Sequence, residues 1–258
     1  MRATYFISDL HLCAERPETN AAFFEFMRTT ARKAGALYVQ GDLFEYWIGD
    51  DQLDHDALAR EVAAAFAASA ATGVAQYFMP GNRDFLIGER FACEARMTLL
   101  PDPTLIQLDG ERVLLMHGDT LCTDDAAYQS FRKQVRDPGW QRAFLAKPYA
   151  EREAIARSLR STSDVEKSMK AEAIMDVSAQ AVANAFAAYA CARIVHGHTH
   201  RPADHIYGGQ SRHVLPDWNG VAGALIFQPR QSARKAGWTR ASDTSGQSAV
   251  STGTASNL

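Results

Sequence analysis

Short apolar segments recur along the chain, each rich in β-branched or aromatic residues and each too short to form a helix. This pattern predicts β-strands, because strands need only four to eight apolar positions between polar or turn residues. The predicted strands are residues 4–7 (TYFI), 36–39 (ALYV), 75–79 (AQYFM), 112–116 (RVLLM), 192–195 (ARIV), 212–215 (RHVL) and 223–227 (GALIF).

Helical patterns separate the first three predicted strands. Asn20 can cap a helix that Gly35 ends, and an Ala-rich helix begins after Asp54 and ends at Gly73. Alternating strands and helices favour an α/β fold in which helices cover a sheet.

Residues 123–190 interrupt this alternation, because they are mostly helical in pattern. We interpret 123–175 as an insertion and the remainder as a helix that returns to the sheet. From about Gln228 the chain is rich in Ser, Thr, Gly, Gln and Arg, which predicts a disordered tail over 229–258. One domain over 1–228, including the insertion, is the expected organisation.

Composition narrows the class of protein. The 258 residues are 47% hydrophobic, which is enough for a sizeable core, and the net charge of −3 argues against a nucleic-acid-binding protein. Four widely spaced cysteines favour a reduced, cytoplasmic protein over a disulfide framework or a zinc ribbon. The N-terminus lacks the pattern of a signal peptide, and the Ala-rich helix carries charges that argue against a membrane span.

Candidate chemistry follows five of the predicted strands, because each is succeeded by Asp, Asn or His. Ligands bind at the carboxyl edge of open α/β sheets, so these side chains are candidates for one shared site. They are Asp9, His11, Asp42, Asn82, His117, His196, His198 and His200.

Imidazole and carboxylate ligands together suit divalent ions such as manganese, iron or zinc, and the absence of cysteine argues against structural zinc. The neighbouring glycines, such as Gly41 and Gly81, permit tight turns beside a site. A single Asp or His after a strand is usually a turn or surface residue. Five such strand ends in one chain favour the metal site.

The motifs DLH, GDLFE, GNRD, MHGD and GHTH resemble, in order, those of the calcineurin-like metallophosphoesterases. This resemblance implies a β-sandwich flanked by helices and a two-metal site. One metal would be held by Asp9, His11, Asp42 and His200. The other would be held by Asp42, Asn82, His117 and His198, with Asp42 bridging. His196 is then expected to be structural rather than a ligand.

Arg83 stands where many members of that superfamily have a histidine that protonates the leaving group. A guanidinium stays charged and cannot donate a proton at neutral pH, but it binds phosphate oxygens in a bidentate manner. This favours a diphosphate substrate, whose phosphate leaving group needs little protonation. The alternative is that Arg83 merely pairs with Asp84.

Longer stretches, including GDLFEYWIGDD, MHGDTLCTDDAAYQ and HGHTHRP, closely resemble the UDP-2,3-diacylglucosamine pyrophosphatase family of lipid A synthesis, over about residues 4–205. The resemblance implies manganese-dependent hydrolysis to UMP and the lipid sugar 1-phosphate, by metal-activated water attacking the α-phosphorus. Asp42, Asn82, Arg83 and His117 would be the catalytic residues. The substrate contacts would be Asn82, Arg83, Asp125, Ser163, Lys167, Lys170 and His198. Lys167 departs from the Asn usual in that family.

The insertion is basic, with ten Lys or Arg against five Asp or Glu between Phe131 and Lys170, a balance of +5. Apolar residues interleave at helical spacing, as at Trp140 and Phe144. Such helices can lie on an anionic membrane, form a wall for acyl chains, or simply pack on the core with a solvated basic face. The resemblance favours a lid for the lipid, peripheral to the cytoplasmic face of the inner membrane.

Two competing interpretations remain. One is a general nucleotide pyrophosphatase or phosphodiesterase that uses the same dimetal site. The other is a binding protein with an inactive site, which is disfavoured because all seven ligand positions carry competent residues. Neither a nucleic acid nor an obligate protein partner is expected.

Overall fold

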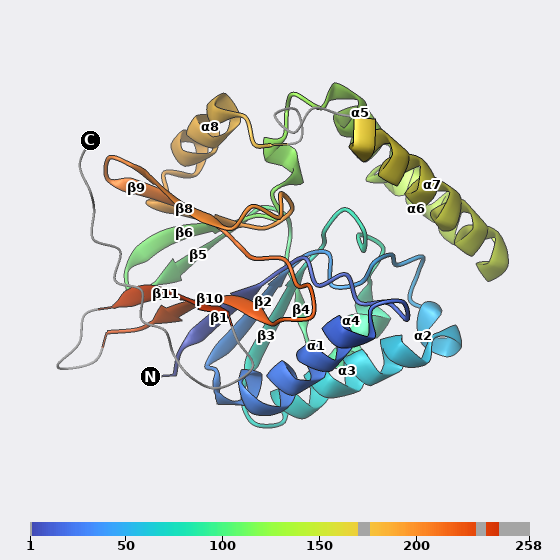
Figure 1. Ribbon diagram of the computed structural model, residues 1–258, viewed down its shortest axis with the longest axis horizontal. Helices are drawn as coiled ribbons and strands as arrows, with labels where there is room; N and C mark the ends of the chain where they lie inside the picture. The colour runs from blue at the N-terminus through green and yellow to red at the C-terminus, as the bar shows by residue number, and fades with distance from the viewer. Residues whose placement is uncertain (1, 170–175, 231–235, 243–258) are drawn as a thin grey trace.

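The computed structural model describes residues 2–169, 176–230 and 236–242. Its centre is a pair of β-sheets (Figure 1). The first sheet has the strand order β11-β10-β1-β2-β3-β4, in which β1, β2, β3 and β4 are parallel. Its strands are β1 (Thr4–Ile7), β2 (Ala36–Gln40), β3 (Ala75–Met79), β4 (Thr98–Leu99), β10 (Gly223–Gln228) and β11 (Gly237–Ser242).

The second sheet has the order β5-β6-β7-β9-β8, with β6, β7 and β9 parallel to one another. Both parallel sets direct their carboxyl ends toward one edge of the molecule, which is where the predicted site residues follow. The strands of this sheet are β5 (Thr104–Leu108), β6 (Glu111–Leu115), β7 (Arg193–His196), β8 (Ala203–Tyr207) and β9 (Gln210–Val214).

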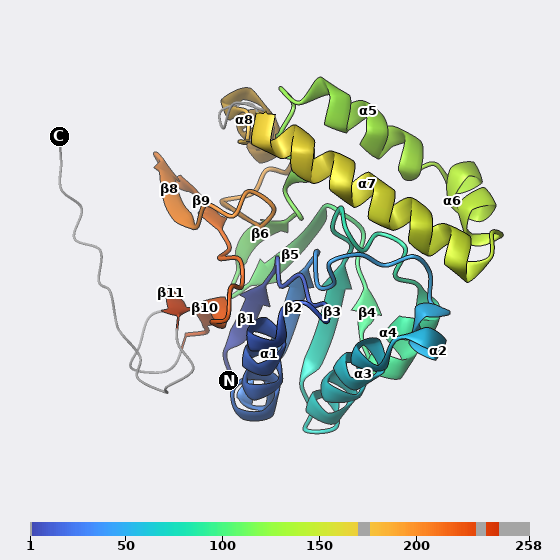
Figure 2. The same cartoon turned by 45° about the vertical axis from the view of Figure 1, so that its right-hand side comes forward.

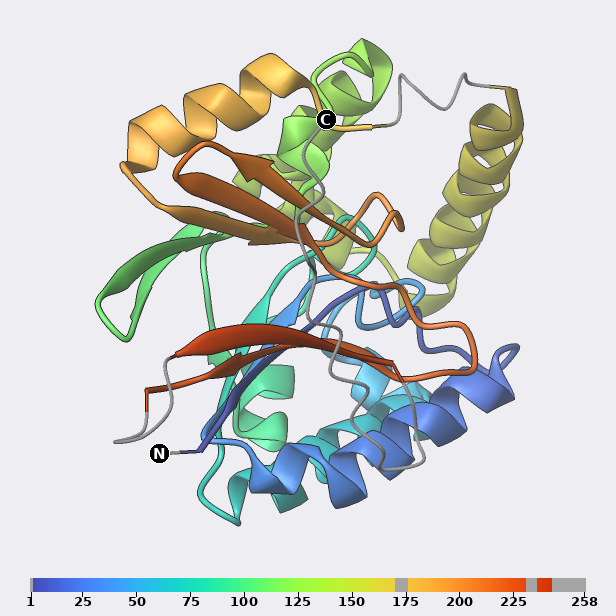
Figure 3. The same cartoon turned by 60° about the vertical axis from the view of Figure 1, so that its left-hand side comes forward.

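The two sheets stack face to face as a sandwich (Figure 3). Alternate side chains of each strand point into the space between them, because successive residues in a strand face opposite sides. Phe6 and Met79 from the first sheet meet Val113, Leu115 and Val195 from the second in one buried cluster. The sandwich expected from the family resemblance is therefore present.

Helices cover the outer faces of both sheets. On the first sheet, Ile7 and Val39 pack against the apolar stripes of the covering helices. On the second, α8 (Ala179–Tyr189) buries Phe186 against Ile194. The helices on the side of the first sheet are α1 (Pro17–Thr29), α2 (Gln52–His55), α3 (Ala57–Ala70) and α4 (Glu89–Ala95). Two short 3-10 helices elsewhere in the chain span Ala31–Lys33 and Asp119–Leu121.

The helical insertion comprises α5 (Ala126–Val135), α6 (Pro138–Leu145) and α7 (Tyr149–Met169). Figure 2 shows these three helices together above the carboxyl ends of β1, β2 and β3. Asp125 and Asp137 begin α5 and α6 as N-caps, accepting hydrogen bonds from the backbone N–H groups of Tyr128 and Trp140. The insertion therefore lies over the edge that carries the site.

Two expectations require correction. Asn20 lies inside α1, which begins at Pro17, and its side-chain amide instead donates to the carbonyl of Cys13. The tail expected from 229 onward contains strand β11, which pairs with β10 and stacks Trp238 on Phe6. The sequence obscured this strand because a single Trp supplies most of its apolar surface. The remaining expected tail, 231–235 and 243–258, lies outside the described residues.

All four cysteines are free. Across the described parts of the chain, no helix combines the length and the apolarity needed to cross a bilayer. The Ala-rich segment expected after Asp54 forms one helix, α3, which Asp56 caps by accepting from the N–H groups of Leu58 and Ala59.

Candidate metal centre

The polar residues that follow β1, β2 and β7 adopt an unusual backbone conformation. Asp9, His11, Asp42, His198 and His200 all have φ between 51° and 69°, in the left-handed region that non-glycine residues rarely occupy. Such strain persists where the surrounding structure enforces it, and it clusters at functional sites. The loops are therefore bent so that five side chains converge.

The first cluster joins residues from β1 and β7. His11 Nε2 lies 3.3 Å from His200 Nε2, and His200 Nε2 lies 3.4 Å from Asp9 Oδ1. Asp42 Oδ2 completes the group at 3.8 Å from His11 Nε2. Ligand atoms of Asp9, His11 and His200 lie close enough together to hold one cation.

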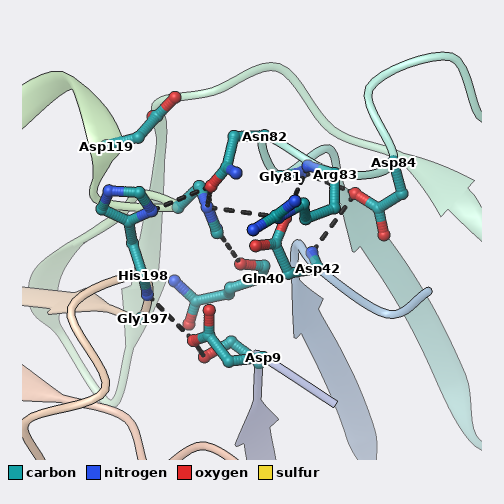
Figure 4. A network of polar contacts seen from close by, with 12 residues as sticks. Asp9, Gln40, Asp42, Gly81, Asn82, Arg83, Asp84, Asp119, Gly197 and His198 are labelled. Atoms are coloured by element: carbon teal, nitrogen blue, oxygen red, sulfur yellow. Dashed lines mark hydrogen bonds and ion pairs between the residues drawn. The ribbon is translucent and has the colours of Figure 1, made fainter. Parts of the chain in front are cut away.

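The second cluster lies beside the first and shares Asp42 with it. Figure 4 shows Asp42, Asn82 and His198 together with Asp9 of the first cluster. His117 Nε2 lies 3.7 Å from Asp42 Oδ1. Asn82 Oδ1 lies 2.9 Å from both His117 Nε2 and His198 Nδ1. Asp9, Asp42 and His117 also form a group of ligand atoms with metal-binding spacing. All seven predicted ligand residues are thus adjacent, with Asp42 between the two clusters.

Only a glycine fits at position 81, directly before Asn82, because the backbone there lies against Asp42. A Cβ at position 81 would lie 2.2 Å from Asp42 Oδ1 and 2.3 Å from the Asp42 backbone nitrogen. The close approach allows the N–H of Arg83 to donate to Asp42 Oδ1 at 2.9 Å. The central carboxylate is therefore held by backbone that only glycine accommodates.

Two buried residues that sequence reasoning missed support these clusters. The Gln40 carbonyl accepts from Nδ1 of His117 at 2.9 Å, and its side-chain amide donates to the carbonyls of Met116 and Val195. This fixes the His117 tautomer with Nε2 facing the site. A polar glutamine ending a buried strand was the available signal.

Asp84 is the second missed residue. Its carboxylate accepts from the backbone N–H groups of Asp42, Leu43 and Gly81, joining the loops that follow β2 and β3. Burial and the neighbouring Asp42 raise the pKa of Asp84 to about 7. Its oxygens are thus occupied by backbone groups, whereas Arg83 Nη1 lies 3.9 Å from Glu45 Oε1.

His196 is buried within the sheet edge, and its ring faces away from the clusters. Nδ1 lies 2.9 Å from the carbonyl of Gly197, and Nε2 lies 2.9 Å from Nη1 of buried Arg212. Burial and the Arg212 charge lower the pKa of His196 to about 3. This neutral imidazole supports the turn that carries His198 and His200.

The electrostatics of the clusters fit divalent cations. Burial lowers the pKa of His117, but the charges of Asp42, Asp119 and Asp9 outweigh it and raise that pKa to about 9. Asp9 Oδ1 is buried, lies 3.4 Å from His200 Nε2 and, among the described residues, accepts no hydrogen bond of ordinary geometry. A buried carboxylate oxygen is costly unless it is paired or bound to metal. Oxygen and imidazole donors of this kind match the preference of manganese, iron or zinc.

A cavity of about 510 Å³ extends from these clusters to the insertion. The cavity is lined by Arg83, Asp125 and five of the seven predicted ligands, here called its polar end, and by an apolar wall. Of the remaining predicted substrate contacts, Ser163 and Lys167 lie on α7 with side chains outside the described structure, and Lys170 lies outside the described residues. The apolar wall includes Phe85, Phe131, Val135, Trp140, Phe144 and Leu159.

Comparison with known proteins matches residues 3–202 to the calcineurin-like phosphoesterase family. A UDP-2,3-diacylglucosamine hydrolase from Aromatoleum aromaticum is 55% identical over 221 residues, covering 84% of this chain and 89% of that protein. Its counterpart from Escherichia coli O81 is 54% identical over 203 residues, covering 79% and 84%. Zinc-complexed Vps29 from Entamoeba histolytica has a TM-score of 0.45 at 13% identity, covering 93% of this chain and 98% of that one. The chain belongs to the calcineurin-like phosphoesterase family.

Proposed function

We propose that this protein hydrolyses the diphosphate bond of UDP-2,3-diacylglucosamine to give UMP and 2,3-diacylglucosamine 1-phosphate, a step of lipid A biosynthesis. The names of relatives more than half identical over most of the chain support this substrate. The single structural observation that carries the proposal is the cavity, since it joins a polar donor cluster to an apolar wall. A nucleotide sugar that carries acyl chains needs the polar cluster for its diphosphate and the apolar wall for its acyl chains.

Two divalent cations, which we propose to be Mn²⁺, fit the donor clusters. Asp9, His11, Asp42 and His200 would hold one. Asp42, Asn82, His117 and His198 would hold the other. The chemistry that such ions supply when bound is activation of water at neutral pH and neutralisation of phosphoryl charge.

The reaction itself is direct hydrolysis. Water attacks the α-phosphorus next to uridine, and the bond from that phosphorus to the bridging oxygen breaks. The sugar phosphate leaves with the electron pair of that bond. Arg83 binds the phosphoryl oxygens and offsets their charge. Its guanidinium cannot protonate the leaving group, so its contribution is electrostatic.

The apolar wall is suited to the acyl chains. Trp140 and Phe144 stack with ring centroids 5.0 Å apart, and both face the cavity. Each buried methylene contributes about 0.8 kcal/mol, so acyl chains supply much of the affinity. Phe131, Leu145 and Leu159 also leave apolar surface exposed on this basic insertion. We propose that it contacts the anionic inner membrane from the cytoplasmic side.

The decisive assay is Mn²⁺-dependent release of UMP from UDP-2,3-diacylglucosamine, with the monoacyl compound as comparison. In oxygen-18 water, the label is expected in UMP. Label confined to the lipid product would exclude attack at the α-phosphorus. Equal rates on UDP-2,3-diacylglucosamine and on soluble nucleotide sugars would instead support a general nucleotide pyrophosphatase.

A further inference from the structure

Glu45 is a buried carboxylate in the cavity for which sequence reasoning gave no role. It follows Asp42 in the loop after β2, and its side chain is only 8% exposed. Its backbone N–H donates to the carbonyl of Leu12, which fixes it beside the loop after β1. A buried carboxylate of this kind requires partners that offset its desolvation.

The partners of Glu45 come from three separate parts of the chain. Oε2 lies 3.5 Å from Nδ1 of His11, the ring nitrogen opposite the one that faces the clusters. Oε1 lies 3.9 Å from Nη1 of Arg83 and forms an ion pair with Nη1 of Arg160. Arg160 belongs to α7, so one carboxylate contacts a candidate ligand, the loop after β3 and the insertion.

We propose that Glu45 is a positioning residue that holds Arg83 and the insertion's Arg160 at the polar end of the cavity while orienting His11. This inference rests on the proposed function, because its consequence is recognition of a phosphorylated substrate. Glu45 itself touches neither the substrate nor the reacting atoms. It acts through the three groups that it contacts.

The charges explain why such a residue is needed. Two guanidinium groups that line one cavity repel each other, and this repulsion is strong where water is partly excluded. Glu45 provides the shared counter-charge, so Arg160 keeps α7 close to the clusters. Its second oxygen faces His11 Nδ1, and a carboxylate at that position fixes ring orientation for metal binding.

Two variants of Glu45 separate the two contacts. Glu45→Gln keeps the size of the side chain and an oxygen that can lie near His11 Nδ1, but it removes the charge shared by the arginines. Glu45→Ala removes both contacts. Glu151→Gln is the matched control, since Glu151 is an exposed glutamate of α7 paired only locally with Lys147.

The measurements are KM and kcat for UDP-2,3-diacylglucosamine, the same constants for bis(p-nitrophenyl) phosphate, and Mn²⁺ affinity by calorimetry. For Glu45→Gln we expect KM for the lipid substrate to rise about tenfold, the size of one charge-assisted hydrogen bond. Its Mn²⁺ affinity stays close to that of the parent, whereas kcat on either substrate falls only as far as Arg83 loses its position. For Glu45→Ala, Mn²⁺ affinity also falls about 10-fold to 100-fold.

Arg160→Met provides an independent arm that does not depend on the folding of the Glu45 variants. It is expected to raise KM as Glu45→Gln does, and the double variant is expected to lose less than the sum of the two single losses, because both changes break the same contact. Unchanged KM in Glu45→Gln, or additive losses in the double variant, would overturn the inference. So would an equal loss in Glu151→Gln.

Failure of the proposed function has a different signature. If the parent protein does not hydrolyse UDP-2,3-diacylglucosamine, the substrate assignment is wrong. The inference about His11 is then decided by the Mn²⁺ titration of Glu45→Ala alone, where unchanged affinity rejects it.

Discussion

The Asp9 carboxylate lies directly against the Cα of Gly197, so closely that a Cβ at position 197 would stand 2.1 Å from Asp9 Oδ2. The N–H of the next residue, His198, donates to that same oxygen at 2.9 Å. Ser8 Oγ donates to it as well, at 2.5 Å. The turn that carries His198 and His200 is thus positioned by contact with the loop after β1.

Gly197→Ala is expected to displace this turn and to reduce Mn²⁺ affinity and hydrolysis by at least about 100-fold, because the buried carboxylate of Asp9 and the side chain of Ser8 leave no space for a methyl group. Calorimetric titration and UMP release measure the two effects. Gly209→Ala is the control, since a Cβ there meets nothing within 4 Å. Normal metal binding by Gly197→Ala would show that the turn adapts.

Asp42→Ala is expected to abolish hydrolysis and to lower the bound metal content, because Asp42 lies between both donor clusters. Metal analysis of the purified protein together with the UMP assay tests this. Asp54→Ala is the control, since Asp54 is an exposed aspartate paired with Arg90. Retained activity in Asp42→Ala would indicate a contaminant or a second site.

Arg152→Met is expected to lower the free energy of unfolding by about 2–4 kcal/mol, because it removes a buried guanidinium that pairs with Asp51 and donates to the carbonyls of Ile48 and Lys147. Urea denaturation measures the change. Arg157→Met removes an exposed pair on the same helix and is expected to lower the free energy of unfolding much less. Equal effects of the two variants would mean that the Asp51 contact does not anchor the insertion.

Trp140→Asp is expected to raise KM for UDP-2,3-diacylglucosamine while leaving hydrolysis of a small chromogenic phosphodiester nearly unchanged. A charged side chain in the apolar wall disfavours acyl chains but lies away from the polar end. Steady-state kinetics on both substrates gives the comparison. Equal losses on both substrates would contradict the proposed role of the insertion in lipid binding.

Asp204→Asn is expected to destabilise the attachment of β11, because Asp204 pairs with Arg240 of β11 and with His213. Burial raises the pKa of Asp204, but these two partners outweigh it and hold the pKa below the usual 3.8. A lowered folded-state pKa adds stability above the unfolded-state value, and this stability is lost as pH falls through the folded-state pKa.

The difference in unfolding free energy between the parent and Asp204→Asn is therefore expected to be constant above about pH 5 and to shrink below pH 4. Urea denaturation at several pH values measures it. A difference that does not change with pH would mean that the carboxylate charge has no role in holding β11.

The sequence by itself determined seven of the eleven described strands, the family and the chemical types at the site. Five apolar runs followed by Asp, Asn or His were sufficient, because strand periodicity and ligand chemistry are local properties. The seven predicted ligand residues lie together for the same reason, since parallel strands bring their carboxyl ends to one edge. Strands β4, β5, β8 and β11 escaped prediction, because their apolar residues are few or interrupted by polar ones.

Only the tertiary structure decided which polar residues support the site. Gln40, Asp84 and Glu45 are ordinary loop or strand-end residues in sequence, and their importance comes from partners on distant segments. Asn20 failed as a predicted cap for the related reason that the chain entering α1 took Pro17 as its first helical residue. Burial and long-range pairing depend on how the two sheets and the insertion pack, which local patterns do not encode.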